Sequence, residues 1–146
     1  MTALLTLLLA ASLALAPHDR GPADEVQAVL AGIATAVDAD TGEPLTGTRE
    51  GDALLLLVWS HHESRWRVCP GGDGGKAWGP LQLQHTPRAL VCAPAEAARI
   101  WLAMARAAVA TCGDLTPIAS GVCGRARGLV VRRMREAEGL QRRSER

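Results

Sequence analysis

The 146-residue chain contains no phenylalanine and no tyrosine, so its four tryptophans are the only large aromatic side chains. A cleft lined by aromatic rings can draw only on these four. The apolar fraction of 48% is ordinary for a globular protein and is carried by alanine, leucine and valine. The length provides for one domain with one core, and no internal repeat indicates a second.

Basic residues are scarce in the first half of the chain. Residues 17–63 hold two basic and nine acidic side chains, whereas residues 125–146 hold eight arginines and three glutamates. The formal net charge of +1 therefore conceals a strong gradient. The basic end could meet an anionic polymer or a membrane surface, although a solvated helix face is the commoner explanation. We expect no nucleic-acid partner.

No lysine or arginine precedes the first apolar run, residues 1–16. This run is too short to span a bilayer comfortably and matches the core of a secretory signal peptide. Pro17 follows the small-residue site, where proline hinders cleavage, so cutting after Ala14 and retention as an anchor both stay open. We expect an exported, periplasmic or extracellular monomer with no stable membrane span after processing.

No C-x-x-C pair occurs, and cysteine spacings of 23, 20 and 11 residues do not suit a zinc site. An even number of cysteines after a secretory signal indicates disulfides, and four cysteines allow three pairings. Cys69–Cys92 and Cys112–Cys123 are preferred because each closes a local loop. The first would stabilise the fold by about 3 kcal/mol on the chain-entropy model. We expect no metal and no cofactor.

Apolar periodicity predicts an all-α or α-dominated domain of four to five helices. The helices are expected over residues 24–38, 53–66, 94–111, from Asp114 to about Val122, and over 125–139. Asp52 and Asp114 are expected to cap the second and fourth of them. The last helix is expected to bury Leu129, Val130 and Met134 and to carry its arginines outside.

These elements define the expected organisation of the chain. Residues 17–23 are predicted to be a linker, residues 24–139 the folded domain and residues 140–146 a charged, frayed tail.

The stretch from Cys69 to Trp78 has four glycines in five positions around Asp73. A phosphate-binding loop is excluded, because Ala77 follows Lys76 where serine or threonine is needed. A calcium loop is a poor match, since Asp73 stands alone. We expect a flexible hairpin or irregular loop pinned by Cys69.

Glu63 is unusual because an acid occupies the last turn of an apolar helix. Its spacing from Leu55, Leu56 and Trp59 places it on their side of that helix. An ionised carboxylate is costly there unless it is paired or its pKa is raised, and a raised carboxyl pKa is what a general acid needs near neutral pH. The alternative is a surface salt bridge with Arg67 at i+4.

The two histidines before Glu63 do not complete a zinc-protease motif, because Trp66 stands where H-E-x-x-H needs its second histidine. Adjacent helical residues point about 100° apart, so both rings cannot easily chelate one ion. We expect His61 to be exposed and His62 to be a cleft residue.

Three pieces of the chain resemble the soluble lytic transglycosylase family of the lysozyme-like superfamily. Glu63-Ser64 resembles that family's Glu-Ser pair at a helix end, and Gly79-Pro80-Leu81-Gln82 its Gly-Leu-Met-Gln type motif. Ile118-Ala119-Ser120-Gly121 stands where the family has a Tyr-Asn-Ala-Gly type motif, so the family's tyrosine has no counterpart. The resemblance covers about residues 53–124 and implies a lysozyme-like small domain with an irregular glycine-rich loop.

The resemblance also implies an activity on peptidoglycan glycan strands. Glu63 would cut the β-1,4 bond between MurNAc and GlcNAc as general acid and base, while Ser64 and Gln82 would support it and line the sugar cleft. One acid suffices in that family, because the substrate's own N-acetyl group stabilises the cationic sugar and the 6-hydroxyl closes a 1,6-anhydro product. A hydrolysing lysozyme needs a second carboxylate, for which Asp73 is the nearby candidate.

Two further interpretations complete the predictions. Trp66 is expected in the core, and Trp78, beside Gly79, is expected at the cleft rim as a stacking position. The missing tyrosine keeps a non-catalytic glycan- or protein-binding module on the same fold as the alternative.

Overall fold

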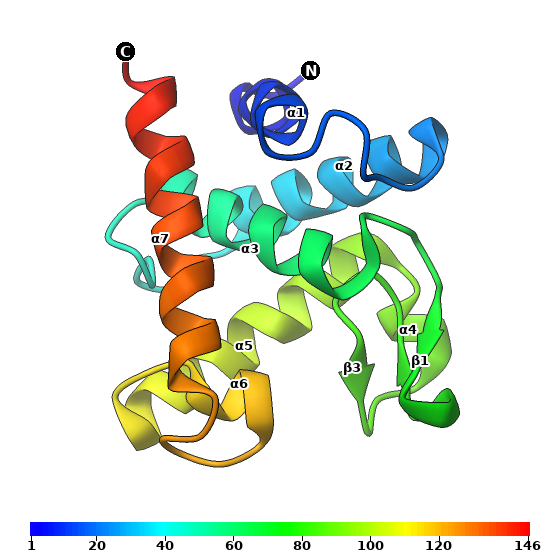
Figure 1. Cartoon of the computed structure of the whole chain (residues 1–146), viewed down its shortest axis with the longest axis vertical. Coiled ribbons are helices and arrows are strands. Elements are labelled where there is room, and N and C mark those ends of the chain that lie inside the picture. The colour runs from blue at the N-terminus through cyan, green and yellow to red at the C-terminus, as the bar shows by residue number, and fades with distance from the viewer.

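The computed structural model describes all 146 residues and confirms an α-dominated domain (Figure 1). Its helices are α1 (Ala3–Leu15), α2 (Ala23–Ala39), α3 (Arg49–Ser64), α4 (Arg88–Val91), α5 (Pro94–Cys112), α6 (Thr116–Ser120) and α7 (Arg127–Ser144). A small antiparallel sheet contains β1 (Gly71–Gly72), β2 (Ala77–Trp78) and β3 (Leu83–Gln84), with the 3-10 turn η1 (Asp73–Gly75) between the first two strands.

Helix α3 lies at the centre of the molecule, and α1, α2 and α7 pack against it (Figure 1). Every residue from 51 to 60 is buried, as expected for a helix that is apolar on all sides. The apolar stripe predicted for α2 is confirmed, since all five of its members are at most 2% exposed: Val26, Val29, Leu30, Ile33 and Val37.

The start of α3 differs from the prediction. Thr48 is the N-cap, and its Oγ1 accepts a hydrogen bond from the amide of Gly51 at 3.0 Å. Asp52 is instead a buried residue of the helix that accepts hydrogen bonds from the amides of Leu45 (3.0 Å) and Thr46 (2.8 Å). The Asp52 carboxylate thus holds the loop before α3 in place, and α3 begins at Arg49, one turn earlier than expected.

The C-terminal helix also corrects the sequence analysis. Residues 140–144 are helical rather than frayed, because Leu140 is buried against the core. Val130 is buried and Leu129 and Met134 are partly buried, as expected, but one arginine is inside as well. Arg133 is only 9% exposed, so the prediction that all arginines of this helix lie outside was wrong.

Both preferred disulfides are confirmed. Cys69–Cys92 joins the start of the sheet region to the segment between α4 and α5, with the Cα atoms 4.8 Å apart. Cys112–Cys123 joins the end of α5 to the loop before α7, with the Cα atoms 5.6 Å apart. Helix α5 ends, as predicted, on Gly113 in the left-handed conformation.

Helix α6 is shorter than expected and stops at Ser120. Its N-cap residue is Leu115 rather than the predicted Asp114, whose carboxylate accepts a hydrogen bond from the amide of Thr116 at 2.9 Å. Hydrogen bonds from the Thr116 hydroxyl and amide lower the pKa of the Asp114 carboxyl.

The first apolar run forms α1, which packs against α2, α3 and α7. Leu4 and Leu8 are buried there, and Arg20 donates a hydrogen bond to the hydroxyl of Ser12 at 3.1 Å. Across the whole chain, none of the helices combines the length and the apolar character that a membrane crossing requires. Removal of this segment by a signal peptidase stays a prediction, while the disulfides agree with an oxidising compartment.

Candidate functional site

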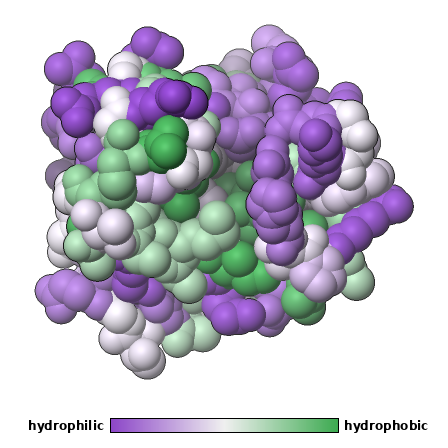
Figure 2. Space-filling view, turned by 90° about the horizontal axis from the view of Figure 1, so that it is seen from below, coloured by the Kyte–Doolittle hydropathy of each residue, from purple (hydrophilic) through white to green (hydrophobic).

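A groove of about 560 Å³ lies between the small sheet and α6. Its lining residues come from α3, β1, the β2–β3 turn, β3, α5 and α6. Figure 2 views the molecule from below, where a hollow with an apolar floor separates two lobes, the one on the right being largely hydrophilic. This volume is within the range of small-molecule sites in proteins.

Glu63 lines this groove, with its side chain 29% exposed. Its Oε1 accepts a hydrogen bond from Nη1 of Arg133 at 2.7 Å, while its Oε2 has no hydrogen-bond partner within the chain. The expected alternative, a salt bridge with Arg67, is therefore wrong: the partner comes from α7, 70 residues away. One oxygen of the acid is held and the other is available to the groove.

Arg133 is the main residue that the sequence analysis missed. Its side chain is 11% exposed, and its guanidinium lies 4.6 Å from the ring centroid of Trp59, which also lines the groove. An ion pair and a cation–π contact together offset the removal of this cation from water. The signal was present in the spacing, since residue 133 is three positions after Val130 and four before Ala137, both buried.

Gln82 lines the groove opposite α6, as the resemblance implies. Its Nε2 donates hydrogen bonds to the carbonyls of Pro70 (2.8 Å) and Gly79 (3.0 Å). Its Oε1 lies against Gly72, where an added Cβ would come within 2.1 Å of it. Gln82 therefore braces the sheet and forms part of the groove wall at the same time.

The opposite wall is the segment from Ile118 to Gly121, the third piece of the resemblance. Ile118 makes this wall aliphatic at the position where the resemblance would place a tyrosine. Ser120 donates from its Oγ to the carbonyl of Thr116 at 2.9 Å, so its hydroxyl is used within α6. Three motifs that are far apart in the sequence thus line one groove.

Three predicted substrate-binding residues do not lie in the groove. Ser64 is buried and donates to the carbonyl of Ser60 at 2.9 Å. His62 faces away, with its Nε2 3.1 Å from Oε2 of Glu136. Trp78 donates to the carbonyl of Gly75, and the guanidinium of Arg88 covers its ring at 3.9 Å. None of the three is among the lining residues, so direct substrate contacts from them lack geometric support.

The two remaining aromatic predictions had opposite outcomes. Trp66 is fully buried, as expected, and its Nε1 donates to the carbonyl of Leu57 at 2.9 Å. His61 is not exposed: its side chain is 13% exposed, and its ring lies 4.6 Å from that of Trp66. Its Nε2 contacts the carbonyl of Asp19 at 2.7 Å, so the ring is a structural contact to the segment after α1.

The glycine-rich stretch, expected as a flexible hairpin or irregular loop, contains β1, η1 and β2, with Gly71 opposite Trp78. This arrangement brings Asp73 into the groove, where its Oδ2 accepts a hydrogen bond from Nε2 of Gln84 at 2.6 Å. His85 also lines the groove, in a left-handed backbone conformation with φ of 57°. The sequence analysis did not single out Gln84 or His85.

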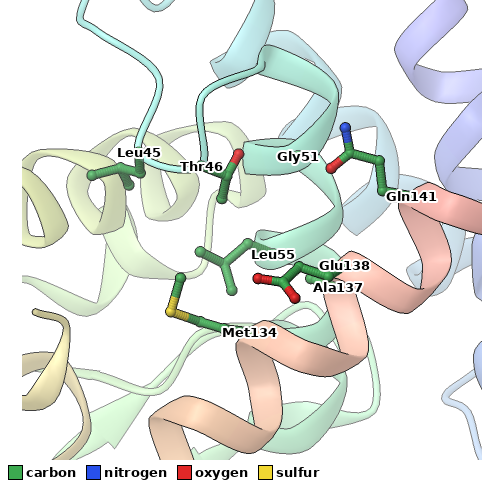
Figure 3. A pocket seen from close by; sticks show the side chains of 8 residues that line it. All are labelled: Leu45, Thr46, Gly51, Leu55, Met134, Ala137, Glu138 and Gln141. Atoms are coloured by element: carbon green, nitrogen blue, oxygen red, sulfur yellow. The ribbon is translucent and has the colours of Figure 1, made fainter.

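A second hollow, of about 200 Å³, lies between the loop before α3, α3 itself and α7 (Figure 3). Leu55, Met134 and Glu138 face its interior, and Glu63 is not part of it. Because its volume is smaller and none of the motif residues lines it, the larger groove is the candidate site.

Comparison of the chain with protein-family models, curated proteins and solved structures gives no match. The case for a lytic transglycosylase site therefore depends on the motifs and on their common groove.

Proposed function

We propose that this protein is an exported enzyme that cleaves peptidoglycan glycan strands in the manner of a lytic transglycosylase, with Glu63 as the acid and base. One observation carries the proposal: Glu63, Gln82 and the Ile118–Gly121 segment line the same groove. The three motifs lie on three different elements, so their meeting does not follow from any one helix or loop.

The geometry of Glu63 supports different roles for its two carboxyl oxygens. Arg133 donates to Oε1 and fixes the direction of the carboxyl group. Oε2, without a partner in the chain, is the oxygen that can carry a proton to the bridging oxygen of a bound glycan. After the bond breaks, the same oxygen can take the proton of the sugar's 6-hydroxyl, so the acid is regenerated when the anhydro ring closes.

Glu63 is nevertheless held in an ion pair with the largely buried Arg133, a contact that a purely structural role for the acid also explains. This observation supports the second candidate, a non-catalytic lysozyme-like module that holds glycan in the same groove. The aliphatic side chain of Ile118 in place of the family's tyrosine points the same way.

The proposal is tested by incubating the purified protein with peptidoglycan and analysing the soluble products by mass spectrometry. A transglycosylase releases 1,6-anhydro ends, which are lighter by one water than the products of a hydrolase. Glu63→Gln should abolish release. Asp73→Asn should leave anhydro products unchanged, whereas a hydrolase that uses Asp73 would lose its products with this variant.

Binding separates the two candidate functions. A wild-type protein that sediments with insoluble cell wall and releases nothing is a binding module, and the enzymatic proposal then fails. Undiminished release by Glu63→Gln, with the variant shown to be folded, would equally remove Glu63 from the mechanism.

A further inference from the structure

The outward face of α7 carries arginines and glycines, with the exposed Val131 at its edge. Gly128, Arg132, Arg135, Gly139, Arg142 and Arg143 recur at spacings of three, four and seven residues, which places them on one side of the helix. We call this set the arginine stripe. The buried residues Val130, Arg133, Ala137 and Leu140 occupy the opposite side. The stripe extends over about 22 Å at 1.5 Å per residue.

The arginines of this stripe are largely free of acidic partners. All four are exposed, and their only ion pair is a 4.0 Å contact between Arg142 and Glu138. A solvated helix face usually alternates charges of both signs, which stabilise each other at i and i+4. Here four like charges are gathered on one face, and three of them, Arg132, Arg135 and Arg143, form no ion pair within the chain.

The two glycines of the arginine stripe place no side chain between its arginines. A Cβ added at Gly128 would meet only the Arg132 guanidinium, at 3.5 Å, and one added at Gly139 only that of Arg143, at 3.9 Å. No packing within the molecule therefore requires glycine at these positions, although each lowers helix stability. Their effect is to leave the helix backbone accessible between guanidinium groups that lie along it.

We infer that the arginine stripe binds a linear polyanion without bases, a chain of regularly spaced phosphate or carboxylate groups that lies lengthwise along α7. The guanidinium fork matches both anions, so the shared chemistry is a row of oxyanions. The inference does not depend on the proposed cleavage of peptidoglycan, because none of the stripe residues lines the groove.

The surroundings of the stripe favour a narrow strand over a membrane. Glu136 flanks one edge and Glu138 the other, so a broad anionic surface would also meet these carboxylates. A single strand can lie between them. One exposed apolar side chain, Val131, lies beside the stripe, whereas an interfacial helix buries a continuous apolar face in the bilayer. It has no aromatic ring on which a base could stack, so nucleic-acid bases gain nothing from it.

The test measures binding of the full chain to four probes: long-chain inorganic polyphosphate, polygalacturonate, single-stranded DNA of matched charge, and vesicles of anionic phospholipid. At least one of the first two should bind, and the tighter identifies the anion. With four arginines engaged, raising salt from 50 to 200 mM should weaken binding roughly 60-fold, from a log–log slope of about −3.

Matched variants locate the site. Arg132→Gln with Arg135→Gln should remove about half of the salt slope. The control, Arg67→Gln with Arg99→Gln, makes the same change in net charge away from α7 and should leave the slope unchanged. Equal losses in both double variants would show attraction by net charge alone and overturn the inference. So would tighter binding of DNA or vesicles than of both linear polyanions, or no binding at all.

Discussion

The contact between Glu63 and Arg133 should be measurable as an energetic coupling. Its N–O distance is 2.7 Å, with side chains 29% and 11% exposed. Exposed pairs contribute about 0.2–1 kcal/mol, and breaking a fully buried pair costs about 3–5 kcal/mol. Because Glu63 is more accessible to water than Arg133 and neither side chain is fully buried, we expect a coupling of about 2 kcal/mol, between these limits.

The assay is a double-mutant cycle from urea unfolding of the wild type, Glu63→Gln, Arg133→Met and the double variant. Methionine retains much of the aliphatic packing against Trp59 while it removes the charge. Glu63→Gln should be the more damaging single change, because it leaves a buried guanidinium without an anion. The double variant should be about 2 kcal/mol more stable than the sum of the single effects predicts.

A matched control exists on the same helix. Glu138 and Arg142 are 59% and 67% exposed and 4.0 Å apart, so their cycle should give a coupling below about 0.5 kcal/mol. If the Glu63–Arg133 coupling is no larger than that of this control, the two side chains do not form the partly buried pair described above. The Arg133 contact would then not be what fixes the direction of the Glu63 carboxyl group.

Three further outcomes are expected. Gly79→Ala should lower the free energy of unfolding, measured in urea, by about 3 kcal/mol or more. The reason is that φ of Gly79 is +86° and the new Cβ would come within 1.9 Å of the Val91 carbonyl oxygen. Gly139→Ala should raise the free energy of unfolding by about 0.5–1 kcal/mol, since its surroundings are open and alanine favours helix. The Arg106 guanidinium holds the pKa of the Asp40 carboxyl below its ordinary value, so this acid stabilises the fold above about pH 4, and the contribution disappears as pH falls through the lowered, folded pKa. Asp40→Asn should therefore flatten the acid side of the stability–pH curve, as measured by unfolding at a series of pH values.

Local patterns predicted α2, α3, α5 and α7 well, because apolar periodicity is a property of short segments, whereas the four-residue α4 was not expected and seven helices form instead of four to five. The stripe of α2 and the glycine end of α5 needed no knowledge of the rest of the chain. The start of α3 was less determined, since Thr48 and Asp52 are both good caps. The choice depends on the preceding loop, whose amides need the carboxylate of Asp52.

The sequence indicated those residues of the groove that belong to motifs and missed those that packing brings there. The resemblance indicated Glu63 and Gln82, and both lie in the groove. Sequence neighbours of the acid were poor guesses, because adjacent helical residues point in different directions; Ser64 lies inside the molecule and His62 faces Glu136. Arg133 could be identified only from its spacing, because it lies on the buried side of α7 together with Val130 and Ala137.

The walls of the groove are elements too short to hold their shape alone. The strands on one side have two residues each, and α6 on the other side has five. Each wall is tied by a disulfide: Cys69–Cys92 anchors the sheet region, and Cys112–Cys123 closes the segment that contains α6. On the chain-entropy model each bond contributes about 3 kcal/mol. In a reducing compartment both constraints would be lost while the packing of α2, α3 and α5 remained, so the groove would deform before the core does. The proposed site therefore requires an oxidising environment, which links the expectation of export to the geometry around Glu63.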